Sequence, residues 1–270
     1  MSARQIGFLG LGDMGEPMAA QLLRGGHRVR SCVYRRREAL ERLSSLGLEE
    51  RDSPNAVAQR SEILITCVVD EAQTDAVLRG PHGVLAGLAP DSVLVIASTV
   101  SAAYCQAIAD ELKARRIHVL DCPVSGGRAR AERGELALIA GGEEAVLERC
   151  RAVLETMGNL FHCGGVGMGQ IAKLINQGLL FSTVQLVQEG RALGRSYGMN
   201  VDTLMDVLNH STARSFASEN WDMFVSIWAH VVPLAQKDLQ LCLDAAHAQD
   251  VQMPLVAARR DLPWSLADSE

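Results

Sequence analysis

The sequence lacks several features that would place it in a special class of proteins. No run of about 18 consecutive apolar residues occurs, so a membrane-spanning helix is not expected. Residues 1–20 show the pattern of a strand, a turn and a helix, which differs from that of a signal peptide. Positive charge is not in excess: the net charge is −6 and the pI about 5.7. We therefore expect a cytoplasmic protein that binds neither membranes nor nucleic acid.

Paired cysteines and clustered metal ligands are missing as well. The 7 cysteines are odd in number and form no CxxC pair, which is typical of small buried residues in a reducing compartment. The 7 histidines show no metal-ligand spacing, so we expect no metal site. The chain has 270 residues, of which 48% are hydrophobic, and this is enough to bury a substantial core and to form two domains.

A glycine-rich motif near the N-terminus is the most informative feature that is present. Gly10, Gly12 and Gly15 form G-x-G-x-x-G after an apolar run and before a helical pattern that Gly25 and Gly26 close. The first glycine allows a tight turn, the second lets a diphosphate approach the backbone, and the third lets helix and strand pack closely. The diphosphate would lie on the free N–H groups of the helix N-terminus. We predict a dinucleotide site with these members: Gly10, Leu11, Gly12, Asp13, Met14 and Gly15. A purely structural turn is the alternative.

The residues after the second expected strand indicate which dinucleotide is bound. NAD sites usually have an acidic residue there, which binds the ribose 2′-hydroxyl. In this chain the position holds Arg35, Arg36 and Arg37, and the first acidic residue is Glu38. Guanidinium groups pair with a 2′-phosphate through two parallel hydrogen bonds. The sequence thus favours NADP, with NAD possible; a solvated, charged helix start would explain one or two of the arginines.

The first half of the chain alternates short apolar runs with helical patterns. Continuous apolar runs are typical of strands that are covered on both faces, so we predict an α/β fold with a doubly wound, Rossmann-type parallel sheet. The runs lie at residues 5–9, 28–34, 62–69, 92–97 and 116–120, with 136–140 as a possible further strand. Thr99 follows one of these strands at its carboxyl end, where such sheets bind ligands. We assign Thr99, Val68 and Val69 to the cofactor site.

The second half shows helical patterns only. After a helix at residues 143–157 the pattern changes near 164–169, and residues 170–197 then predict one long helix. Because it is apolar nearly all round, this helix must be wrapped by other helices or by another subunit. Further helices are expected at 201–209 and 234–249. We predict an NADP-binding Rossmann domain at 1–163, an all-α substrate and oligomerisation domain at 164–270, and a homodimer or homotetramer.

Five motifs in order resemble the β-hydroxyacid dehydrogenases, a family that includes 3-hydroxyisobutyrate dehydrogenase and tartronate semialdehyde reductase. They extend from residue 4 to about 255 and begin with the glycine motif. The other four are Ser98-Thr99, then Asp121-Cys-Pro-Val-Ser-Gly-Gly127, then Gly169-Gln-Ile-Ala-Lys173-Leu-Ile-Asn176-Gln177, and finally Lys237-Asp238-Leu239. The resemblance implies that Lys173 is the catalytic residue, which gives a proton to a carbonyl oxygen or takes it from a hydroxyl.

The resemblance also implies how a small carboxylate-bearing substrate is held. Ser125, Gly126 and Gly127 would bind its acid group, since a hydroxyl beside exposed N–H groups suits a carboxylate. Asn176 and Gln177 lie one helical turn from Lys173 and would bind substrate. The family usually has a second asparagine at the position of Gln177. Glutamine is longer by one methylene, which changes the reach of the amide and puts the substrate preference of this protein in question. Thr99 would lie near the nicotinamide ribose, and Lys237 would approach cofactor and substrate.

The sequence therefore predicts an NADP-preferring oxidoreductase that interconverts a small 3-hydroxy acid, or a related hydroxyacid, with its semialdehyde or keto acid. Two alternatives stay open: an enzyme similar to imine reductases, which generally lack the lysine, and a non-catalytic NADP-binding or oligomerisation module. The end of the chain departs from the family because Pro263 prevents a long final helix. This departure could expose apolar surface on the α domain.

Overall fold

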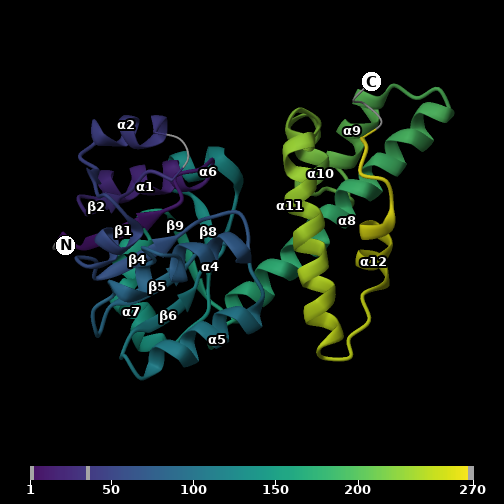
Figure 1. The fold of residues 1–270 in the computed structure, drawn as a ribbon. Coiled ribbons are helices and arrows are strands. Elements are labelled where there is room, and N and C mark those ends of the chain that lie inside the picture. The colour runs from purple at the N-terminus through teal and green to yellow at the C-terminus, as the bar shows by residue number, and fades with distance from the viewer. Residues whose placement is uncertain (1–2, 35–36, 267–270) are drawn as a thin grey trace. The chain divides into compact units, whose positions relative to one another are not determined.

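The computed structural model describes residues 3–34 and 37–266. The chain divides into two compact units, one up to Lys173 and the other from Leu174 onward. In Figure 1 the purple-to-teal part of the chain contains the labelled strands, and the green-to-yellow part contains α9 to α12 and most of α8. The two domains expected from the sequence meet at residue 163, and the two units meet ten residues further on, inside a helix.

A parallel sheet with the strand order β3-β2-β1-β4-β5-β6 forms the centre of the first unit. The direction of the order reverses between β1 and β4, which is the point where doubly wound sheets bind ligands. This arrangement confirms the predicted doubly wound fold. The strands are β1 (Gln5–Leu9), β2 (Arg28–Ser31), β3 (Glu49–Glu50), β4 (Ile63–Thr66), β5 (Val93–Ile96) and β6 (His118–Asp121).

Helices cover both faces of this sheet, which explains the continuous apolar runs. On β4, Ile63 and Ile65 belong to one apolar cluster and Leu64 to the other, so neither face is wet. The helical segments of this part are α1 (Gly15–Arg24), α2 (Glu38–Ser44), α3 (Pro54–Ala58), α4 (Glu71–Arg79), the 3₁₀ turn Val84–Ala86, α5 (Ala102–Lys113), α6 (Gly127–Arg133) and α7 (Glu144–Leu154).

The predicted strand at 136–140 exists, but it belongs to a second sheet with the order β7-β8-β9. In this sheet β8 (Leu136–Ala140) pairs antiparallel with β7 (Val124–Ser125) and parallel with β9 (Gly158–His162). Neither β7 nor β9 was predicted. Most residues of β9 are exposed or half-buried, and its sequence therefore has no continuous apolar run from which a strand could be predicted. Cys163, directly after β9, is exposed, contrary to the expectation of buried cysteines.

The described part of the second unit contains helices and connecting loops but no strand, and its core lies between two long helices. Its elements are α8 (Met168–Ser196, which starts in the first unit), α9 (Val201–Asn209), α10 (Phe216–Glu219), α11 (Trp221–His247) and α12 (Pro254–Asp261). The predicted start of a helix at 234 was wrong, because α11 continues through Pro233. Burial of Trp221, Phe224 and Trp228 on the turns before this proline stabilises the helix there. No described helix combines the length and apolarity needed to cross a bilayer.

The last described residues are part of this core. Trp264 stacks on Trp228 at 6.0 Å between ring centroids, and Leu266 is only 1% exposed. Helix α12 is short, as the position of Pro263 predicts, and the chain beyond it is packed in place by these side chains. Apolar surface is exposed instead on α8, at Leu179, Leu186 and Leu193.

Candidate functional site

The glycine turn between β1 and α1 has the geometry that two of its glycines demand. Gly10 has φ of +100°, and a Cβ there would overlap the carbonyl oxygen of Cys67. A Cβ on Gly15 would overlap the carbonyl oxygen of Gly10 and lie 3.0 Å from the Phe8 ring on β1. Packing within the chain itself therefore requires glycine at positions 10 and 15.

Gly12 differs from these two glycines. Its φ is not positive, it is exposed, and a Cβ there would meet no described atom within 4 Å. The residue before the first turn of α1, Met14, makes no side-chain hydrogen bond to that turn. An anion can therefore reach the N–H groups of α1 across Gly12. The packing of the chain does not require glycine at position 12, and the start of α1 is uncapped. These two features are better explained by a bound diphosphate than by a purely structural role of the turn.

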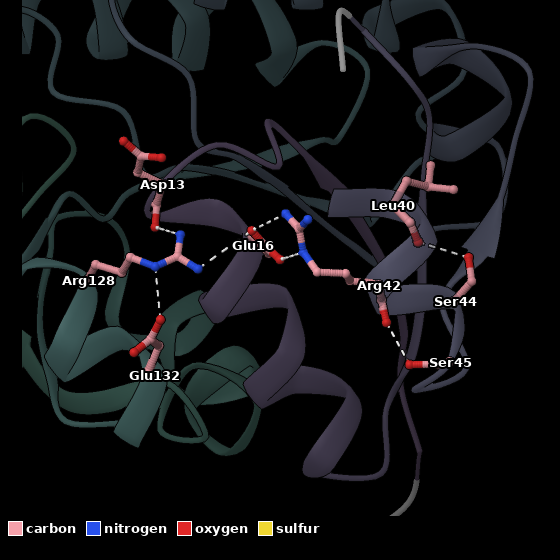
Figure 2. Close-up of polar contacts among 8 residues, drawn as sticks. All are labelled: Asp13, Glu16, Leu40, Arg42, Ser44, Ser45, Arg128 and Glu132. Carbon is pink, nitrogen blue, oxygen red and sulfur yellow. Dashed lines mark hydrogen bonds and ion pairs between the residues drawn. The ribbon is translucent and has the colours of Figure 1, made fainter. Parts of the chain in front are cut away.

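Two arginines, which the sequence analysis did not single out, gather at the first turn of α1. Figure 2 shows Arg42 on α2 and Arg128 on α6 reaching Glu16 from opposite sides. Arg42 pairs with Glu16 through Nε at 2.6 Å and Nη2 at 3.0 Å, and Arg128 lies 3.6 Å from the same carboxylate. The hydrogen bond from Arg42 is the main reason why the pKa of Glu16 is lowered. Positive charge is thus held beside the predicted diphosphate site.

Arg128 also joins two predicted parts of the site. Its Nη1 donates to the carbonyl oxygen of Asp13 at 3.3 Å, inside the glycine turn. The residue directly follows the predicted substrate-binding glycines Gly126 and Gly127. The sequence signal was one of four charged residues on a short helix, a pattern that ordinarily indicates a solvated surface.

The arginine group after β2 is only partly described. Arg35 and Arg36 lie outside the described residues. Arg37 donates to Glu50 at 2.6 Å and lies 3.5 Å from Glu41. A 2′-phosphate at Arg37 would therefore compete with acidic residues for its guanidinium group.

The carboxyl ends of β4 and β5 bring Val68, Ser98 and Thr99 together. The N–H of Val68 donates to Ser98 Oγ at 2.9 Å, and Thr99 is half-buried beside it in the chain. Val69 is 51% exposed, so its side chain contributes little to the packing of the unit. Since the N–H of Cys67 donates to the carbonyl oxygen of Leu9 at 2.8 Å, this edge adjoins the glycine turn. The structure therefore places these predicted cofactor residues at one edge of the sheet.

The segment Ser125–Gly127 connects β7 to α6. Gly126 has φ of +135° and Gly127 has φ of +72°, conformations that favour glycine. Ser125 and Gly126 are half-buried. Gly127 is exposed, and a Cβ there would meet no described atom within 4 Å. The open space is therefore at Gly127, whereas a Cβ on Gly126 would lie 2.9 Å from Arg130 Cδ; a carboxylate-binding segment requires such open space beside an N–H group.

Lys173 lies in the second turn of α8 and is only 7% exposed. The start of this helix is fixed by Asp121 at the end of β6, whose two carboxylate oxygens accept from the N–H groups of Gly167 at 2.6 Å and Gln170 at 2.8 Å. Burial raises the pKa of Asp121, and these backbone hydrogen bonds act in the opposite direction. Asp121 and Gln170 lie within two of the sequence motifs, but neither residue had a predicted role. An acidic residue at the end of a buried strand was the available signal.

Gln177 and Lys237 meet at a buried carboxylate in the second unit. Gln177 Nε2 donates to Asp238 Oδ2 at 2.6 Å, and Lys237 Nζ lies 2.8 Å from Asp238 Oδ1. Asp238 is 4% exposed and Gln177 9%. Asn176 is exposed and donates to Gln177 Oε1 at 3.2 Å. The side chain of Gln177 therefore links α8 to α11, and the sequence analysis did not anticipate this link.

Comparison with known families covers nearly the whole chain. A model described as the NAD binding domain of 6-phosphogluconate dehydrogenase matches residues 5–167. A second model, described as the NAD-binding region of NADP-dependent 3-hydroxyisobutyrate dehydrogenase, matches residues 167–269.

Individual proteins of known sequence and structure are also similar to this chain. L-threonate dehydrogenase of Cupriavidus necator is 33% identical over 96% of this chain and 89% of its own length. 3-Hydroxyisobutyrate dehydrogenase of Pseudomonas aeruginosa is 34% identical over 95% and 90%. The crystal structure of 3-hydroxyisobutyrate dehydrogenase from Salmonella typhimurium superposes with a TM-score of 0.85 at 31% identity, over 95% of this chain and 91% of that one.

Proposed function

The chain belongs to the β-hydroxyacid dehydrogenase family, and from this premise we propose that it interconverts a small hydroxyacid and its semialdehyde or keto acid, with NADP as the preferred cofactor. It is an NAD(P)-dependent oxidoreductase. The observation that carries the proposed chemistry is the burial of Lys173 in the turn of α8 that follows the Asp121 anchor at the carboxyl end of β6, since lysines are seldom buried.

The binding residues have separate tasks. The glycine turn and the start of α1 hold the diphosphate, and Arg35, Arg36 and Arg37 favour a 2′-phosphate over an unmodified ribose. The nicotinamide, when bound, supplies or accepts a hydride. Ser125 Oγ and the N–H groups of Gly126 and Gly127 hold the substrate carboxylate.

Proton transfer is assigned to one side chain. Lys173 gives a proton to the carbonyl oxygen in reduction and takes the hydroxyl proton in oxidation. Thr99, Val68, Val69 and Lys237 complete the cofactor site. Asn176 and Gln177 are the amides proposed for the substrate, Asn176 by direct contact and Gln177 through its hydrogen bond with Asn176. Because Gln177 is already bound to Asp238, we expect Asn176 to be the amide that is available to a substrate.

Substitution of Lys173 tests the chemistry. Lys173→Ala should lower kcat about 10²–10⁴-fold for semialdehydes and keto acids that carry a carboxylate, while NADPH still binds. Lys113→Ala, at the exposed end of α5, is the matched control and should keep full activity. Turnover of Lys173→Ala at the rate of the unsubstituted protein would remove the proposed proton donor.

Substitution of Gly12 tests the cofactor site separately. Because a Cβ there meets no described atom within 4 Å, Gly12→Ala should fold with an unchanged melting temperature. Its methyl group would occupy the path of the diphosphate, so we expect the Kd for NADPH in calorimetric titration to rise at least 10-fold. An unchanged Kd would favour the structural interpretation of the motif.

The cofactor preference requires a direct comparison. Kd values for NADPH and NADH should differ in favour of NADPH, and Arg35→Ala combined with Arg36→Ala should remove most of that difference. A double variant that weakens both cofactors equally would assign these arginines to general electrostatics instead.

We further propose that the protein works as a homo-oligomer. Ile175, Leu179, Leu186 and Leu193 are 48%, 64%, 61% and 62% exposed and follow each other on α8 at intervals of four and seven residues, so they share one helix face. These apolar side chains can pack against their own copy around a two-fold axis, with exposed Glu189 at the margin of the face. Leu186→Gln should shift the mass measured by light scattering toward the monomer, whereas Leu46→Gln, on an exposed leucine of the first unit, should not.

A further inference from the structure

Gln170 is a fully buried amide that bonds twice to a neighbouring segment. It is the third residue of α8 and is 0% exposed. Its Nε2 donates to the carbonyl oxygen of Ser98 at 2.9 Å, and its Oε1 accepts from the N–H of Val100 at 3.2 Å. These two backbone groups lie on either side of Thr99, so one side chain holds both ends of that residue.

The backbone of Gln170 is fixed as well. Its N–H donates to Asp121 at the end of β6, and the same carboxylate accepts from Gly167. Ser98, to which the amide donates, accepts in turn from the N–H of Val68 after β4. The first turn of α8 is therefore tied to the carboxyl ends of three neighbouring strands, β4, β5 and β6.

Lys173 follows Gln170 by three residues, which is a rise of about 4.5 Å and nearly one helical turn. A helix whose first turn is fixed transmits that position to the next turn, because each N–H of the helix bonds four residues back. The amide of Gln170 is therefore a side-chain contact that holds the turn carrying Lys173 in place relative to the Ser98–Val100 segment.

We propose that Gln170 is a positioning residue for proton transfer: it holds Lys173 at a set distance from the Ser98–Val100 segment, where the cofactor site lies. This inference rests on the proposed role of Lys173. Misplacement of a reacting group by about 1 Å can reduce a rate about 100-fold, so a residue at this point affects kcat more than substrate affinity.

The test uses Gln170→Met, which keeps the length of the side chain and removes both hydrogen bonds. We expect kcat to fall about 10- to 100-fold while KM changes less than about 3-fold. The deuterium isotope effect on kcat with 4-deuterated NADPH should increase, because the chemical step becomes slower. In the protein without cofactor, the Val100 amide should exchange its hydrogen at least 10-fold faster.

Gln106→Met is the matched control. Gln106 on α5 donates to the carbonyl oxygen of Val166 at 3.3 Å, close in sequence to the start of α8, but it does not bond to the Ser98–Val100 segment. This variant should keep the kcat, the isotope effect and the Val100 exchange rate of the unsubstituted protein. If Gln170→Met behaves like this control, or if it only lowers the fraction of active sites at an unchanged kcat per site, the inference is overturned.

Two further variants separate the possible failures. Gln170→Glu keeps an acceptor for Val100 and loses the donor to Ser98. If Gln170→Met does not fold, Gln170→Glu takes its place, and we expect the same kcat loss and the same increase in the isotope effect. The absence of both changes in Gln170→Glu would overturn the inference. Lys173→Ala decides the underlying function. Full turnover of Lys173→Ala refutes the proton donor itself, whereas inactive Lys173→Ala beside fully active Gln170→Met refutes only the positioning role.

Discussion

Trp264 should contribute more to the stability of the helical unit than its place near the end of the chain suggests. Its ring stacks on Trp228 at 6.0 Å and meets the edge of Phe181 at 6.3 Å. The guanidinium of Arg259 lies over the ring, 3.8 Å from its centroid, and Arg259 is only 2% exposed. Trp264→Ala would remove both ring–ring contacts. It would also remove the aromatic ring that stabilises the buried guanidinium of Arg259.

The magnitude follows from these contacts. A Trp→Ala change in a core costs about 3–5 kcal/mol, and Trp264 is half-buried, so roughly 2 kcal/mol is expected from the lost packing. A desolvated cation–π contact adds about 1–2 kcal/mol and the aromatic pairs about 1 kcal/mol. We therefore expect the free energy of unfolding of the second unit to fall by about 4 kcal/mol. Trp264→Phe keeps a ring and should lose less than half of that.

Urea unfolding followed by tryptophan fluorescence is the appropriate assay, because Trp221 and Trp228 remain in the variant and both belong to the same unit. A double-mutant cycle with Arg259→Met should give a coupling energy of about 1–2 kcal/mol. A loss below about 1 kcal/mol for Trp264→Ala, with no coupling to Arg259, would refute the reasoning and show that residues 262–266 lie on the unit without stabilising it.

Three other perturbations have definite expected results. The pKa of Glu16 is lowered from 4.5, so its ion pair stabilises the fold above pH 4.5 and this contribution is lost as the pH falls through the lowered pKa. Arg42→Gln should therefore raise the pH at which Glu16 titrates in carbon-detected NMR, and an unchanged midpoint would contradict the pairing. Gln177→Asn is one methylene too short to reach Asp238, so the free energy of unfolding measured in urea should fall by about 1–2 kcal/mol; equal or greater stability would show that the amide link is dispensable. Asp121→Asn replaces one acceptor by a donor, so the amides that bond to it should exchange hydrogen about 10-fold faster, and unchanged exchange would contradict their bonding.

The parallel sheet and the long helix could be predicted from the sequence because their signals are local. The apolar runs of β4 and β5 are buried on both faces, and Gly10 and Gly15 occur where the turn geometry requires them. In these cases the signal is a local pattern of residues, an unbroken apolar run or glycines at a fixed spacing, even though the atom that Gly10 must avoid belongs to Cys67.

The remaining features depend on contacts between residues far apart in the chain. Asp121 and Gln170 are 49 positions apart, and nothing in the periodicity of either segment indicates that one fixes the other. Glu16 is paired with Arg42 and Arg128 for the same reason: three surface-like charges become a cluster only after folding. Pro233 shows the opposite error, since a local helix breaker is overruled by the packing around it.

The single helix α8 has a consequence for exchanging parts between relatives. The boundary between the two compact units falls after Lys173, inside this helix, and the two family models meet at residue 167, just before its first residue. A chimera that joins one protein's nucleotide-binding part to another's helical part at residue 173 would take the start of α8 from one parent and the rest of that helix from the other. A junction among the glycines at 164–167 would transfer α8 whole but part it from its Asp121 anchor. Because Asp121 accepts from backbone N–H groups and the Gln170 amide bonds to Ser98 and Val100, a chimera at this junction should fold only when the first parent has a carboxylate at 121 and the second has glutamine at 170.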